Sequence, residues 1–273
     1  MPVYINKQEI KTAKPMMSKS AKSLVLFIIV SFFLPLMMVA IQAKISDNVI
    51  GFVFYGIQAA APSISAIVVF AVNRELRISF SRLFRKDHLG MAILLPVAIV
   101  CTVMVTARIL SSQITGELSS FWGTISYKQW IIILWAIVAE ELGWRGYLEP
   151  ALNKLIVNKR IVPGIVGLIW CLWHYHYFIQ NSIEVPVALF LTGCIIESYI
   201  CSYLMRITKD NLVSAMAFHF MYNLMIHAVA INPSDNNGSI IPYVTMTILE
   251  ALVMFILIIW DTKVKKSHLE KKS

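Results

Sequence analysis

The sequence predicts an all-α, polytopic membrane protein with eight transmembrane helices and both termini in the cytoplasm. Of the 273 residues, 58% are hydrophobic and only 14% are charged, whereas charged residues make up about 25% of a typical soluble domain. Eight apolar stretches reach the length of about 20 residues that a helix needs to cross a bilayer. These stretches cover residues 24–43, 49–72, 91–110, 130–147, 162–179, 185–204, 213–231 and 241–260.

The distribution of basic residues sets the orientation. Of the 24 Lys and Arg residues, 21 fall in the two tails or in the second, fourth and sixth connecting segments, and only Lys44, Arg108 and Lys128 fall on the other side. Basic residues concentrate in cytoplasmic segments, so both termini are predicted to be cytoplasmic and the number of spans to be even. The net charge of +9 then reflects membrane topology, and no nucleic-acid partner is predicted.

The chain divides into a basic tail over residues 1–23, a membrane domain over residues 24–260 and a second basic tail over residues 261–273. The short, Lys-rich tails are typical of a multi-pass protein of a bacterial inner or plasma membrane. The first three spans contain no acid in their interior and are predicted to be scaffold. The four cysteines lie inside predicted spans without metal or redox spacing, which is typical of small buried apolar residues.

The fourth span carries two adjacent acids, Glu140 and Glu141, followed by Arg145. Glu141 and Arg145 are four residues apart and share one helix face, which favours an ion pair. Glu140 points about 100° away from that pair. Because a charge inside the membrane is costly and normally faces a cavity or a partner, Glu140 is predicted to be the group available for chemistry.

The fifth span places Trp170 and His174 on one face, with His174 near mid-membrane. His176 lies about 200° from His174 and is predicted to be an interfacial polar residue at the outer surface. In the sixth span Glu197 is also at membrane depth. Either Glu197 lines the same cavity as Glu140 or it pairs with a neighbouring Tyr or Ser, and the sequence favours the second interpretation.

The seventh span carries His219 and Asn223 one helical turn apart, on one face. His227 is deeper and turned about 80° away from His219, so it is the weaker candidate. In the eighth span Glu250 has no basic residue beside it and receives no role.

Glu140, His174, His219 and Asn223 thus come from three spans and fall between the midplane and the cytoplasmic side. A carboxylate and an imidazole together can remove a proton from water. A second His and an Asn side chain can donate hydrogen bonds to the oxyanion that forms when water attacks an amide. The set predicts peptide hydrolysis without a covalent intermediate and without a cofactor.

Three other interpretations stay open at this point. Glu140, His174 and His219 could bind Zn²⁺, although the sequence has no His-Glu-x-x-His motif. Intramembrane Glu and His could form the proton relay of a transporter, although no inverted repeat is evident. Alternatively, each polar residue could simply hold neighbouring helices together.

The motifs resemble those of the CPBP family, which comprises type II CAAX prenyl endopeptidases and bacterial relatives that process bacteriocins or confer self-immunity. The resemblance rests on three motifs. They are Glu-Glu-x-x-x-Arg-Gly at residues 140–146, the aromatic residue Trp170 four positions before His174, and His-x-x-x-Asn at residues 219–223. These motifs occur in the family's order over residues 130–230. Trp170 departs from the Phe that is common in the family, and it is assigned here to substrate contact.

The resemblance implies an eight-helix intramembrane glutamate protease whose site opens toward the cytosol. Glu140 and His174 would activate the water, His219 and Asn223 would form the oxyanion hole, and Glu141 with Arg145 would be a structural pair.

The expected function is therefore hydrolysis of a peptide or membrane-associated protein near the cytosolic leaflet. The expected partners are this substrate and the lipid bilayer. The alternatives are a non-proteolytic bacteriocin-immunity or peptide-binding membrane protein and, third, a proton-coupled transporter.

Overall fold

The computed structural model describes residues 19–45, 48–73, 84, 86–116 and 121–270, and within these ranges the regular elements are all helical. The predicted all-α membrane class is confirmed. The elements are α1 (Lys19–Gln42), α2 (Asn48–Val72), α4 (Leu89–Thr115), α5 (Tyr127–Ala139), α6 (Glu141–Gly143), a π-helical turn η1 (Trp144–Leu148), α7 (Glu149–Leu155), α8 (Val162–Trp173), α9 (Tyr175–Ile179), α10 (Val187–Ile207), α11 (Val213–Ala228), a 3₁₀ turn η2 (Pro233–Asp235) and α12 (Ile241–Glu270).

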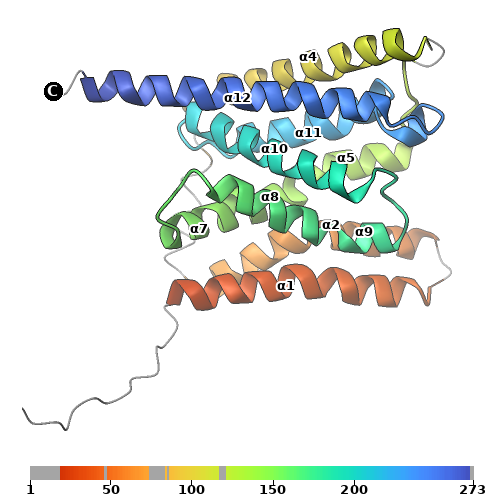
Figure 1. Cartoon of the computed structure of the whole chain (residues 1–273). Coiled ribbons are helices and arrows are strands. Elements are labelled where there is room, and N and C mark those ends of the chain that lie inside the picture. Colours follow the sequence, from red (N-terminus) through yellow and green to blue (C-terminus); the bar gives the residue numbers. More distant parts are fainter. Residues whose placement is uncertain (1–18, 46–47, 74–83, 85, 117–120, 271–273) are drawn as a thin grey trace, which may run out of the picture.

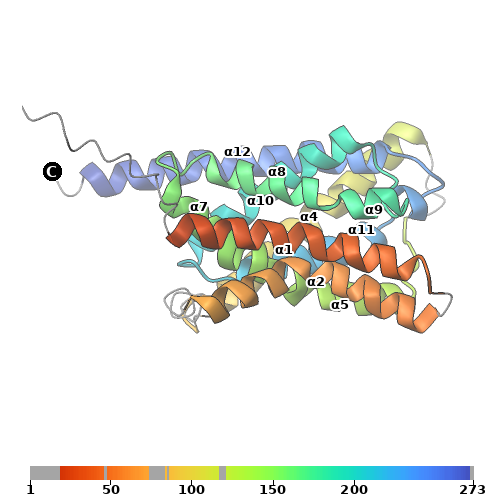
Figure 2. The same cartoon turned by 90° about the horizontal axis from the view of Figure 1, so that it is seen from below.

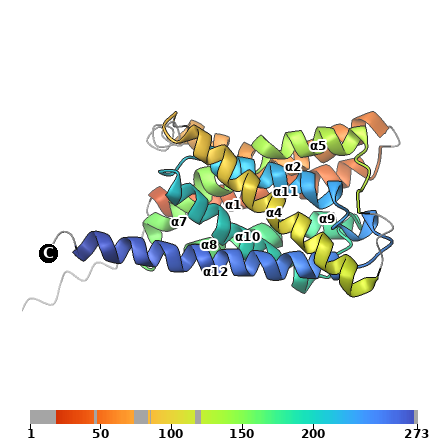
Figure 3. The same ribbon diagram turned by 90° about the horizontal axis from the view of Figure 1, so that it is seen from above.

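The long helices run up and down in one elongated bundle. Helices α1 and α2 form one side, α4 and α12 form the opposite side, and α5, α8, α10 and α11 lie between them (Figures 1 and 2). The start of α1, the end of α12 and the loops α7–α8 and α10–α11 share one end (Figures 1 and 3). We call it the basic end, because its described loops carry Lys154, Lys159, Arg160, Arg206 and Lys209.

Seven helices within the described residues are long and apolar enough to cross a membrane, against the eight predicted. The exception is the predicted fourth span, which is broken at Glu140 into α5, α6, η1 and α7. Helix α12 continues through Glu270, beyond the predicted end of the last span at residue 260. The first 18 residues of the predicted N-terminal tail lie outside the described residues.

The break at Glu140 is stabilised by α2. Glu140 adopts φ −116° and ψ −45° between α5 and α6. Two residues earlier in the chain, the Val138 carbonyl accepts a hydrogen bond from the Ser63 hydroxyl of α2 at 2.8 Å. A broken helix is tolerated in a membrane where neighbouring side chains satisfy the freed backbone groups. The interruption of this span therefore depends on a polar residue in a different helix.

Helix α6 also lies unusually close to α2. A Cβ atom added to Gly143 would lie 2.5 Å from the Cβ and the carbonyl carbon of Pro62. Small residues permit such close approach of two helices in a membrane. Gly143 therefore allows the segment that follows Glu140 to pack directly on α2.

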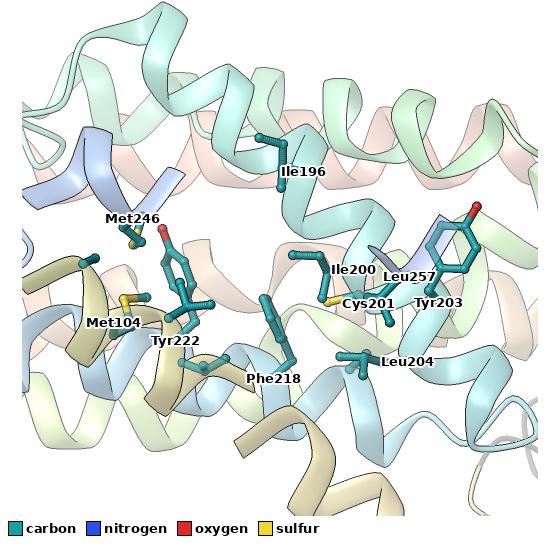
Figure 4. Close-up of a cluster of buried hydrophobic side chains, with 14 of the residues drawn as sticks. Met104, Ile196, Ile200, Cys201, Tyr203, Leu204, Phe218, Tyr222, Met246 and Leu257 are labelled. Atoms are coloured by element: carbon teal, nitrogen blue, oxygen red, sulfur yellow. The ribbon is translucent and has the colours of Figure 1, made fainter. Parts of the chain in front are cut away.

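The apolar core holds the other side of the bundle together. Figure 4 shows a cluster from α4, α10, α11 and α12, in which Met104, Ile200, Leu204 and Met246 are fully buried and Phe218 is nearly so. A second cluster contains Phe27, Trp144 and Trp173, which are also fully buried. Close van der Waals packing of this kind is what associates helices in lipid. The two clusters fix α10 and α11 against the broken segment.

We expect Gly143→Ala to lower the free energy of unfolding by about 1–3 kcal/mol, the usual cost of overpacking a core. The matched control is Gly90→Ala in α4, where an added Cβ would meet nothing within 4 Å. It should leave stability unchanged or raise it by up to about 1 kcal/mol, because Ala favours a helix over Gly. Thermal unfolding of both purified variants in detergent tests this. Equal stability of the two variants would contradict the close contact between α6 and Pro62.

Candidate active site

A single cavity of about 570 Å³ brings the four predicted residues together. Glu140 comes from the break between α5 and α6, His174 from the break between α8 and α9, and His219 and Asn223 from α11. Trp170 and Glu197 line the same cavity. Residues that are up to 83 positions apart in the sequence, from Glu140 to Asn223, thus share one space inside the bundle.

Glu140 is held by two indole groups. The Nε1–H of Trp170 donates to Oε2 of Glu140 at 2.8 Å, and the Nε1–H of Trp144 donates to the same oxygen at 3.3 Å. Within the described residues, Oε1 has no hydrogen-bond partner. Two donors on one oxygen fix the orientation of the carboxylate and leave Oε1 free to bind a water molecule.

Trp170 is the central contact of the site. Its ring lies 5.7 Å from the His174 ring and 5.6 Å from the His219 ring, between centroids, and the guanidinium of Arg145 lies 4.7 Å from its ring centre. The sequence assigned Trp170 to substrate contact. It does line the cavity, but its hydrogen bond to Glu140 also makes it a positioning residue for the carboxylate.

His174 lies where α8 ends and α9 begins. Its Nδ1 is 2.8 Å from the carbonyl oxygen of Trp170. Because a carbonyl only accepts hydrogen bonds, Nδ1 carries the proton and the neutral ring presents its unprotonated nitrogen at Nε2. His174 also packs against Phe190, with centroids 4.9 Å apart. The break and the backbone contact together set the tautomer of this imidazole.

Glu141 and Arg145 form the ion pair that their spacing predicts. Arg145 donates to Oε1 of Glu141 at 2.8 Å, and both side chains have 0% exposure. The same oxygen accepts a hydrogen bond from Nδ1 of His219 at 2.9 Å. Glu141 therefore connects the broken segment to α11 and fixes the His219 ring.

The contact with Glu141 restricts what His219 can do. Because Nδ1 donates to the carboxylate, a neutral His219 would present only an acceptor at Nε2. A hydrogen bond from Nε2 to an oxyanion therefore requires the imidazolium form of His219. The Asn223 side chain lines the cavity one helical turn further along α11 and carries two N–H donors.

The structure also places the other polar residues that the sequence singled out. His176, predicted to be interfacial, is fully buried and contacts the Trp173 carbonyl through Nδ1 at 2.8 Å. The turn at His174 causes this difference, because it changes the direction in which α9 presents its side chains. Glu197 lines the cavity and Glu250 is buried. His227 contacts Asp235 at 2.6 Å.

Trp144 is a site residue that the sequence reasoning missed. It lies four residues after Glu140, so the helical spacing that paired Glu141 with Arg145 also pairs Glu140 with Trp144. The signal was present, but an indole in an apolar span is usually a packing residue.

The zinc alternative requires at least three protein ligands grouped around one point. Within the described ranges, no group of three or more His, Cys, Asp or Glu side chains has the arrangement of a metal site. The observed hydrogen bonds instead join Glu140 to two indoles and His219 to Glu141.

The cavity reaches one end of the bundle. Its polar lining continues from Asn223 to Lys128, Gln129, Ser182, Glu184 and Asn232. These residues belong to the start of α5, the segment before α10 and the segment after α11, at the end opposite the basic end (Figure 1). The resemblance implied an opening on the cytosolic side, whereas the mouth lies at the end with few basic residues.

We expect Arg145→Met to lower the free energy of unfolding by about 3–5 kcal/mol, because the buried carboxylate of Glu141 would lose its positively charged partner. The double variant Glu141→Gln with Arg145→Met should regain most of this loss, since Gln can still accept from His219. Thermal unfolding in detergent measures both effects.

The matched control is Arg206→Met, because Arg206 and Asp261 form a longer, partly exposed pair at 3.7 Å. This change should cost less than about 1 kcal/mol. Similar losses in Arg145→Met and Arg206→Met would contradict a special role for the buried pair.

Comparisons with known proteins agree with the motifs. The sequence model for Rce1-like proteins, described as type II CAAX prenyl endopeptidase Rce1-like, matches residues 120–225, a stretch that contains all four predicted cavity residues. The chain is also 26% identical over 197 residues to CAAX prenyl protease 2 of Methanococcus maripaludis, which covers 63% of this chain and 70% of that protein. Both names denote peptide-bond hydrolases, which confirms the predicted class of enzyme. Over residues 120–225 the chain is therefore similar to the Rce1-like type II CAAX prenyl endopeptidases, which supports the resemblance of its motifs to the CPBP family.

Proposed function

We propose that the protein is an intramembrane endopeptidase of a bacterial plasma membrane, in which Glu140 and His174 activate water for direct attack on a peptide bond. The observation that carries the proposal is the shared cavity, in which an oriented carboxylate, an imidazole of defined tautomer and two candidate oxyanion donors meet. The four residues come from three places in the chain: the breaks at Glu140 and His174, and helix α11. This arrangement supports the same roles that the family motifs imply.

In the proposed first step, a water molecule bound between Oε1 of Glu140 and Nε2 of His174 attacks the carbonyl carbon of the substrate. Glu140 takes a proton from this water as the new C–O bond forms, and His174 accepts a hydrogen bond from the remaining O–H. The carbonyl oxygen becomes an oxyanion. It receives hydrogen bonds from Nε2–H of protonated His219 and from the Asn223 amide.

In the second step the tetrahedral intermediate collapses. The C–N bond breaks as Glu140 returns its proton to the leaving nitrogen, which gives a carboxylic acid, a free amine and the original Glu140 carboxylate. General acid–base catalysis of this kind contributes about 10²–10⁴-fold in rate. Loss of one oxyanion donor costs about 10²–10³-fold. The burial of the site makes these interactions stronger than they would be in water.

The cavity walls also fit a peptide substrate. Aromatic and aliphatic side chains, including Tyr55, Ile132, Phe190 and Ile226, surround the polar groups. Apolar walls with a few directed polar groups are typical of sites that bind a ligand by its shape and orient it by hydrogen bonds. The relative is named a CAAX prenyl protease, so a farnesylated CAAX peptide is a reasonable first probe, and a bacteriocin-leader peptide is the second.

We expect Glu140→Gln and His174→Ala to reduce cleavage of a fluorogenic probe peptide at least 10²-fold, because each removes a group that acts on the water. The measurement compares these variants with wild-type protein, purified in detergent, with and without a metal chelator. Full activity with chelator and loss in the variants supports the proposal. A fully active Glu140→Gln protein would contradict it, and loss of wild-type activity with chelator would favour the zinc alternative.

The same variant separates the protease from the immunity and transport alternatives. An immunity protein that only binds a peptide toxin should still protect cells when Glu140 is Gln. A proton-coupled transporter should carry solute in proteoliposomes. Toxin protection without any peptide cleavage would contradict the proposed function and support the immunity alternative. Solute flux without cleavage would support the transporter.

We expect Trp170→Phe to lower kcat about tenfold with little change in KM, because it removes the indole N–H that orients Glu140 and keeps an aromatic ring. Tenfold corresponds to about 1.4 kcal/mol, close to the lower limit for a hydrogen bond to a charged group. The control Trp135→Phe removes an indole hydrogen bond to the Gly56 carbonyl, away from the cavity. A higher KM at unchanged kcat would instead support the substrate-contact role.

A further inference from the structure

The proposed hydrolysis needs a route by which water and peptide reach Glu140, and the structure offers one at a single end of the bundle. Beyond Glu140 and His219, the polar residues that line the cavity include Asn223, His227, Gln129, Ser182 and Asn232. They follow one another from the middle of the bundle toward the starts of α5 and α10. Lys128 and Glu184 stand at the mouth with opposite charges.

The other direction is closed by buried side chains. Glu141, Arg145 and Trp144 have 0% exposure and lie between Glu140 and the basic end. A second, smaller cavity of about 300 Å³ at the basic end is lined by Arg145, Glu149 and Lys154, among others, and shares no lining residue with the first. The buried layer around the Glu141–Arg145 pair therefore separates the two spaces.

The charge pattern orients these two ends. In the described residues the basic end carries the Lys and Arg residues of the loops α7–α8 and α10–α11. At the mouth end the described Lys and Arg residues are Lys44 and Lys128, with Arg108 nearby in α4. By the positive-inside rule the basic end faces the cytoplasm. The mouth then faces the outer side.

The depth of Glu140 in the bundle determines how many substrate residues must enter the cavity. Glu140 follows Tyr127, the first residue of α5, by 13 residues, which corresponds to about 20 Å along a helix. An extended chain advances about 3.3–3.6 Å per residue, so about six residues span this distance. The substrate must therefore supply a short extended segment that enters between apolar walls.

We propose that the enzyme takes its substrate from the extracytoplasmic side: an extended, largely apolar peptide segment enters at the mouth formed by Lys128, Ser182 and Asn232 and reaches Glu140 through the outer half of the membrane. This inference rests on the proposed function for the cleavage step, but the direction of the mouth does not. It differs from the cytosolic opening that the family resemblance implied. Both products then leave toward the outer side.

Cysteine labelling tests the direction without any activity. Ser182→Cys at the mouth and Asn158→Cys at the basic end are each expressed in the full chain, and intact cells are treated with a membrane-impermeant maleimide. Wild type serves as the blank, because its four cysteines lie within the bundle. Ser182→Cys should label at least tenfold more than Asn158→Cys, and both should label equally after permeabilisation. Labelling of Asn158→Cys in intact cells, or protection of Ser182→Cys there, would overturn the inference.

A second measurement tests the route. Purified Ser182→Cys protein cleaves the farnesylated CAAX or bacteriocin-leader probe before and after attachment of a bulky maleimide. The adduct should reduce cleavage at least fivefold, whereas the same adduct on Asn158→Cys should not. Unchanged cleavage by the modified Ser182→Cys protein would overturn entry at this mouth. If wild type cleaves neither probe, the proposed function fails in this assay, while the labelling result still decides the direction of the mouth.

Discussion

In the interior of a membrane, every freed backbone group and every charge needs a partner, and this requirement is most demanding where the α5 helix breaks at Glu140. Ser63 of α2 satisfies the Val138 carbonyl, and Gly143 lets the following turn lie directly against Pro62. Trp144 and Trp170 then donate to one oxygen of the carboxylate. The break thus exposes Glu140 to the cavity while its surroundings hold it in one orientation.

The second constraint is the charge cluster that follows the break. Glu141 accepts from both Arg145 and His219, so one buried oxygen connects the π-helical turn to α11. π-helical turns occur frequently at functional sites, because the extra residue shifts side chains relative to a regular helix. Here the turn brings Arg145 over the Trp170 ring. Hence two adjacent acids have separate tasks: Glu140 faces the cavity, and Glu141 organises the groups around it.

Much of the fold and of the candidate site could be predicted from the sequence, because helical spacing and apolar length are local properties. The eight apolar stretches, the pairing of Glu141 with Arg145 and the grouping of Glu140 with His174, His219 and Asn223 follow from such patterns. The break at Glu140 could not be predicted, because it depends on Ser63 and Pro62 in a helix 75 residues or more away. The direction of the cavity likewise depends on how α2, α5 and α8 to α12 pack against one another, which no local pattern records.

The chemistry depends on Glu140 acting on water directly, and the most direct measurement is a search for an acyl-enzyme by competition with a second nucleophile. Wild-type protein would cleave the probe peptide in the presence of a high concentration of hydroxylamine, with the products identified by mass spectrometry. Direct attack by water predicts only the free carboxylic acid at the new C-terminus at every hydroxylamine concentration. A hydroxamate product that increases with hydroxylamine would reveal a covalent intermediate and contradict the role assigned to Glu140.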